Sequence, residues 1–215
     1  PWYATFSGLA IFVTVLALFL FVHAAESMHP LFVGAMCAAG AFNVNAYGYP
    51  TLILKGINFL LAGVWLIVNF VDNRGEDYPL IRVKYGYFLA LVPLILLESV
   101  LLANYFLRLA PDVITSCCGS LFSAGGTAVP AALEGLPALP ALALFYAIMG
   151  LTVLTGLYCL YKARRQGWFA LFSVLAFAAS WLSIFSFISQ YIYELPTHAC
   201  PFCLLKPEYY YIGYL

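Results

Sequence analysis

Charged residues are scarce in this sequence. Aspartate, glutamate, lysine and arginine make up 8% of the 215 residues, whereas hydrophobic residues make up 65%. The mean hydropathy of +0.97 lies far above the range of soluble globular proteins. Nine basic and nine acidic residues give a net charge of zero, so the chain has no excess of positive charge with which to bind a nucleic acid. The composition predicts an integral membrane protein.

Internal repeats, soluble domains and long polar linkers are also missing. We therefore expect residues 1–215 to form a single integral membrane domain. Pro1 leads directly into the first apolar run, and the last apolar run is cut off at Leu215. We expect the chain to be a fragment of a slightly longer protein.

Long apolar runs are abundant. About 20 mostly apolar residues are needed for a helix to cross a bilayer. Five such runs predict an all-α, polytopic transmembrane helical bundle, and a sixth span begins at Tyr209. The five runs are Trp2 to Val22, Thr51 to Val71, Tyr85 to Leu107, Ala141 to Tyr161, and Trp168 to Tyr191.

The few basic residues predict the orientation of the chain. Six of them fall in two short loops, and such loops are typically cytoplasmic. The remaining three are expected to reach the opposite interface with their long side chains. The first group is Arg74, Arg82, Lys84, Lys162, Arg164 and Arg165, and the second is Lys55, Arg108 and Lys206. Segments 26–50, 111–140 and 195–206 then face the periplasm, and the chain belongs in a bacterial inner membrane.

This orientation gathers five of the six cysteines and all three histidines on the periplasmic side. Only Cys159 lies near the cytoplasmic face. The apolar segment from Leu31 to Phe42 contains glycines and is followed by Asn43 and Asn45, which favours a re-entrant or interfacial segment over a span.

The motif His198-Ala-Cys200-Pro-Phe-Cys203-Leu-Leu-Lys206 is the most specific of these features. Two cysteines with this spacing at a helix start can form a small redox-active disulfide, and positive charge from His198 and Lys206 would favour a thiolate at Cys200. A structural disulfide and a metal-ligand pair remain open.

Adjacent Cys117 and Cys118 form the second feature. Neighbouring cysteines rarely bond to each other because the small ring strains the peptide. One of them could exchange with Cys200 and Cys203 while the other pairs with Cys37. A plain structural staple is the alternative.

A third group lies at the periplasmic end of the first span. Imidazole, thioether and thiolate groups together suit copper or another soft metal. This reading would use His23, Met28, His29 and Cys37, joined by His198, Cys200 and Cys203. There is no Cys-x-x-Cys-His motif for covalent haem attachment.

Glu98 is the only acidic residue near the middle of a predicted span. A carboxyl group there is costly when ionised, so it is a candidate for proton transfer, or else a neutral group bonded to Asn58, Asn69 or a serine. Tyr209 and Tyr210 fit an interfacial aromatic belt, and they could also line a flat ligand such as a quinone.

The stretch Cys200-Pro-Phe-Cys203-Leu-Leu-Lys206 resembles the active pair of the DsbB disulfide-forming proteins and, more loosely, of the vitamin K epoxide reductases. The resemblance covers about a dozen residues. It implies that Cys200 and Cys203 lie beside a bound quinone, with Lys206 near it. Cys117 and Cys118 would then relay electrons from a periplasmic thioredoxin-like protein. DsbB has four spans and well-separated shuttle cysteines, so the match is partial.

We therefore expect a membrane thiol–disulfide oxidoreductase that passes electrons from periplasmic dithiols to a lipid-soluble acceptor. A soft-metal-binding or metal-transfer membrane protein is one alternative. An accessory membrane subunit of a respiratory complex, with structural disulfides in its loops, is another.

Overall fold

The structure is a computed structural model. It describes residues 2–75, 77–110, 112–115, 138–162, 166–184, 188, 191–192 and 200–214. Within these residues the secondary structure is helical, without strands.

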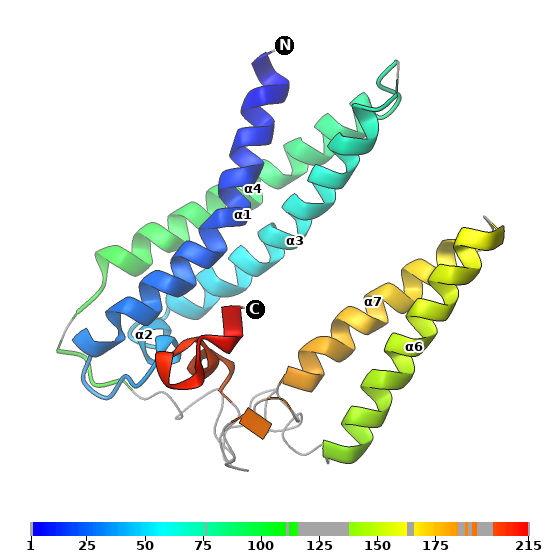
Figure 1. Cartoon of the computed structure of the whole chain (residues 1–215). Coiled ribbons are helices and arrows are strands. Elements are labelled where there is room, and N and C mark those ends of the chain that lie inside the picture. The colour runs from blue at the N-terminus through cyan, green and yellow to red at the C-terminus, as the bar shows by residue number, and fades with distance from the viewer. Residues whose placement is uncertain are drawn as a thin grey trace. The chain divides into compact units, whose positions relative to one another are not determined.

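Five helices are long and apolar enough to cross a membrane. They are α1 (Trp2–Met28), α3 (Gly48–Asp72), α4 (Ile81–Leu107), α6 (Ala138–Lys162) and α7 (Gln166–Ser183) (Figure 1). The predicted all-α architecture and the predicted number of complete spans are confirmed. The chain is an integral membrane protein.

The chain divides into two compact units, Pro1–Cys117 and Cys118–Leu215. In the first unit α1, α3 and α4 pack around a core of Ile11, Ala62, Trp65 and Leu91. Trp65 is fully buried, and its indole N–H donates to the carbonyl of Lys84 at 3.1 Å. This bond joins α3 to the first turn of α4.

The segment between α1 and α3 contains no helix long enough to cross a membrane. It contains the short 3-10 helix η1 (His29–Leu31) and the five-residue helix α2 (Ala38–Phe42), whose residues are all buried. The chain then returns to α3 at the same end of the unit (Figure 1). This agrees with the expectation that the segment is not a span.

In the second unit α6 and α7 form a helical hairpin. Gly156 on α6 lies against the ring of Phe169 on α7, and the Thr152 hydroxyl donates to the carbonyl of Phe172 at 3.1 Å. The helix α7 ends at Ser183, and the predicted span ran to Tyr191. The described residues between these points and just after them, Ile184, Ile188, Tyr191 and Ile192, are also helical. Residues 185–187 and 189–190 lie outside the described part of the chain.

The C-terminal residues fold into three short 3-10 helices, η3 (Pro201–Leu205), η4 (Pro207–Tyr209) and η5 (Ile212–Tyr214). Tyr209 therefore does not open an α-helix within the described residues, in contrast to the predicted start of a sixth span. The φ angles of Tyr210 and Tyr211 are both 55°. Two consecutive left-handed residues are incompatible with a right-handed α-helix.

Candidate thiol site

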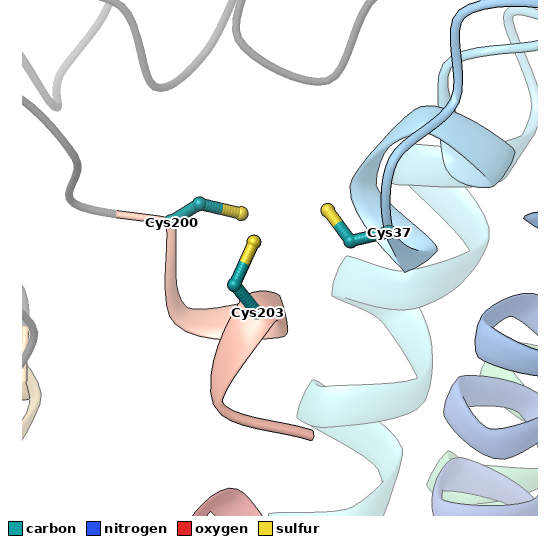
Figure 2. Close-up of side chains that lie close together, drawn as sticks. All are labelled: Cys37, Cys200 and Cys203. Atoms are coloured by element: carbon teal, nitrogen blue, oxygen red, sulfur yellow. The ribbon is translucent and has the colours of Figure 1, made fainter. Parts of the chain in front are cut away.

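Cys200 and Cys203 occupy one tight turn of the second unit. Cys200 is the N-cap of η3, and the backbone N–H of Cys203 donates to the carbonyl of Cys200 at 3.3 Å. The two Sγ atoms lie within 4.8 Å of each other, and both side chains point toward the same region (Figure 2). Cys200 is 1% exposed and Cys203 is 8% exposed. The turn thus keeps two buried thiol sulfurs close together.

The sequence predicted this pair at the start of a membrane helix. The observed 3-10 helix has only five residues, so few peptide dipoles are aligned behind Cys200. A helix dipole can contribute little to stabilising a thiolate there. Any activation of Cys200 must come from neighbouring charges or from the reaction partner.

Lys206 and the tyrosines of the motif form the next turns. The carbonyl of Lys206 accepts hydrogen bonds from the backbone N–H groups of Tyr209, at 3.1 Å, and Tyr211, at 3.2 Å. Tyr210 is 87% exposed, so its ring does not form the wall of an enclosed site within the described part of the chain. Lys206 and Tyr209, in contrast, are half-buried.

Several predicted site residues lie outside the described residues. These are the possible shuttle cysteines Cys117 and Cys118 and the motif histidine His198.

Cys37 belongs to the first unit, where it is the N-cap of α2 and is completely buried; Figure 2 also labels it. The next residue, Ala38, donates its backbone N–H to Oε2 of Glu26 at 2.7 Å. A carboxylate from α1 therefore satisfies the N-terminus of α2 and fixes the backbone that carries Cys37.

The C-terminal carbonyls of α2 are satisfied as well. Hydroxyl groups from three other segments each donate to a different carbonyl, which is an unusually complete set of caps for one helical turn. Tyr49 donates to Ala39 at 3.2 Å, Thr115 to Gly40 at 2.8 Å, and Tyr105 to Ala41 at 3.0 Å. The backbone around Cys37 is thus fixed at both ends of α2.

The predicted soft-metal ligands of the first unit lie at the end of α1 and in the segment that follows it. His23 is exposed on α1, while His29 approaches Glu26 with its Nδ1 atom 3.6 Å from Oε1. Among the described residues of this unit, His23, Glu26, His29 and Cys37 do not bring three ligand atoms together. Met28 lies in the last turn of α1, and Met36 is 69% exposed.

Glu98 has two partners on α3. Its Oε1 atom lies 2.5 Å from Nζ of Lys55, and its Oε2 atom accepts from Nδ2 of Asn58 at 2.6 Å. The predicted bond to Asn58 is present. Lys55, however, was predicted to reach the interface, and this was wrong: it is 3% exposed and pairs with Glu98. The sequence signal was the spacing of Lys55 and Asn58, which places both on one face of a helix.

A second buried ion pair was not predicted. Nζ of Lys84 lies 2.6 Å from Oδ2 of Asp72, and Oδ1 of Asp72 accepts from the backbone N–H of Leu80 at 2.9 Å. The sequence analysis placed Lys84 in a loop, but α4 begins at Ile81 and includes it. Asp72 thereby connects the end of α3 to the start of α4.

Comparison with protein-family models, with curated proteins and with solved structures gives no match. The functional argument therefore depends on the residues of this chain.

Proposed function

We propose that this chain is a membrane thiol–disulfide oxidoreductase in which Cys200 and Cys203 are the reacting pair. The supporting observation is the tight turn that holds their sulfurs within 4.8 Å of each other. A disulfide requires the sulfurs to approach to about 2.05 Å, and side-chain rotation within a Cys-x-x-Cys turn can provide most of that movement.

The proposed reaction is a two-electron exchange. A thiolate of a donor dithiol attacks the Cys200–Cys203 disulfide and forms a mixed disulfide, which the second donor thiol then resolves. The donor becomes a disulfide and the pair becomes a dithiol. The pair then gives two electrons and two protons to a lipid-soluble acceptor of the quinone class, which becomes a quinol, and the disulfide forms again.

The resemblance to DsbB supplies the other roles in this proposal. Cys117 or Cys118 would receive electrons from a periplasmic thioredoxin-like protein and pass them to the pair, while Lys206 and His198 would add positive charge beside it. The basic residues in and beside the two short loops support an inner-membrane orientation with these cysteines on the periplasmic side.

The test is to trap the intermediate. In Cys203→Ser the remaining Cys200 thiolate can attack the disulfide of the oxidised donor protein, which releases one donor thiol and forms a mixed disulfide. No Cys203 thiol is present to break that bond, so the mixed disulfide should accumulate as a reducible adduct on a non-reducing gel. Turnover should fall by at least about 100-fold in both Cys203→Ser and Cys200→Ser. The matched control is Cys159→Ser, which changes a half-buried cysteine on α6 and should keep full activity. A wild-type pair that resists a strongly reducing glutathione buffer, together with no adduct in Cys203→Ser, would contradict the proposal.

A soft-metal site is the second candidate, and the same pair of sulfurs supports it. Two thiolates bound to one tetrahedral metal ion stand about 3.8 Å apart, which is compatible with the observed limit of 4.8 Å. If the pair holds copper or zinc, the purified protein should contain one equivalent of metal, measured by mass spectrometry. Cys200→Ser should lose it and Cys159→Ser should retain it. Cys37→Ser tests whether the buried cysteine of the first unit supplies a further ligand. Absence of metal from wild-type protein reconstituted with either ion would exclude this candidate.

A further inference from the structure

Lys55, Asn58 and Glu98 form a buried polar triad between two membrane-spanning helices. Lys55 lies about two turns from the start of α3, and Glu98 lies about two and a half turns from the end of α4. The three residues are 3%, 0% and 5% exposed, respectively. Ionisable groups at such positions are costly and commonly serve a function.

The contacts of Glu98 are those of an ionised carboxylate. One oxygen faces the Lys55 ammonium group and the other accepts the Asn58 amide N–H. The Lys55 ammonium group also lies 5.6 Å from the ring centroid of Phe21 on α1. In this state the pair of Lys55 and Glu98 has no net charge, which lowers the cost of burying it.

One atom of the triad is not satisfied. Oδ1 of Asn58 is completely buried and receives no hydrogen bond from the described residues. Leaving a buried acceptor without a donor is unfavourable, and a purely structural amide would be expected to have partners for both its atoms. The Oδ1 atom of Asn58 can therefore accept a hydrogen bond from one more donor.

Protonation of Glu98 would supply that donor. A carboxylic acid can donate its O–H, and the Asn58 amide can present Oδ1 instead of Nδ2 to the same oxygen by rotating about its last side-chain bond. Lys55 can keep its hydrogen bond to the other oxygen in both states. The amide is therefore suited to both protonation states of Glu98.

We propose that Lys55, Asn58 and Glu98 form a proton-binding site within the membrane. One proton taken from water forms the O–H bond at Oε2 of Glu98, and the amide of Asn58 turns to accept it. The triad then changes from no net charge to a charge of +1. Proton uptake is thus favoured when negative charge arrives nearby, as it does when an acceptor in the membrane is reduced.

Few other ionisable groups face this site. Glu98 is the only charged residue of α4 between Lys84 and Arg108. Apart from Tyr3 in its first turn, the titratable residues of α1 lie in its last two turns, where Glu26 is bonded to Ala38 and approaches His29, and His23 is exposed. The infrared signal of Glu98 should consequently be separable from that of other carboxyl groups.

Infrared difference spectroscopy of the protein in lipid nanodiscs, between about pH 5 and pH 9, tests the proposal. Wild-type protein should show a carboxylic-acid C=O band that is lost in Glu98→Gln. In Asn58→Leu the band should move to higher frequency, because the acid loses its hydrogen-bond acceptor. Asp72→Asn, which alters the other buried ion pair of the same two helices, should leave the band unchanged.

Two results would overturn the proposal. One is the absence of any band that depends on Glu98, and the other is a band that does not move in Asn58→Leu. If Glu98→Gln fails to fold, Glu98→Asp keeps the acid and should move the band. Cys200→Ser should retain it, so this test is independent of the proposed thiol chemistry.

Discussion

The turn before α2 requires a glycine at position 34. Its φ angle is +86°, a conformation that residues with a Cβ atom rarely adopt. A Cβ atom there would lie 2.2 Å from the carbonyl oxygen of Thr115. That close approach accompanies the backbone hydrogen bond from Thr115 to Val33 at 2.9 Å.

Gly34→Ala should therefore destabilise the first unit. We expect a loss of about 1–3 kcal/mol, because the substitution imposes backbone strain and separates Thr115 from Val33. Thermal unfolding in detergent measures the effect. Gly56→Ala is the matched control, since nothing lies within 4 Å of a Cβ atom at that position on α3, and it should be neutral or slightly stabilising. Equal stability of the two variants would show that the turn at Gly34 is not held as the structure describes.

At the scale of helices, hydropathy predicted that each span exists but not the residue at which each helix begins. The predicted third span began at Tyr85, while α4 begins at Ile81. The difference arises because Asp72 neutralises Lys84 and accepts the Leu80 N–H, which removes the cost of including a lysine in the helix. A hydropathy window treats every lysine as an unpaired charge, so it leaves a paired lysine such as Lys84 outside the predicted span.

The same limitation explains Lys55. Its charge within an apolar run suggested a side chain reaching toward the interface, because the sequence did not show that Glu98 lies opposite it. Pairing between helices depends on their packing, which local periodicity does not determine. Conversely, the segment from Leu31 to Phe42 could be predicted not to span, because its two glycines and the asparagines that follow it are local signals.

At the scale of the whole molecule, composition predicted a membrane protein, and the lengths of the apolar runs predicted its five complete helices. The proximity of Cys200 and Cys203 followed from their spacing, since two residues between them make one turn. The left-handed backbone of Tyr210 and Tyr211, which ends any α-helix there, could not be predicted, because tyrosine has no intrinsic preference for a positive φ angle.

The orientation of the chain is the last prediction, and the native cysteines are poor reporters of it. Cys37 and Cys200 are 0% and 1% exposed, so a thiol reagent would miss them on either side of the membrane. The two ends of α4 are better positions. Asp77, before α4, is exposed, and Ile114, after α4, is 82% exposed.

Each position would be changed to cysteine in a chain whose six native cysteines are serine. The 27 residues of α4 span about 40 Å, so its ends must lie on opposite sides of a bilayer. A membrane-impermeant maleimide added to cells with a permeabilised outer membrane should label Ile114→Cys at once and Asp77→Cys only after lysis, because the basic loops remain in the cytoplasm. The reverse pattern would show that the chain has the opposite orientation. The Cys200–Cys203 pair would then lie on the cytoplasmic side, and a periplasmic dithiol could not be its electron donor.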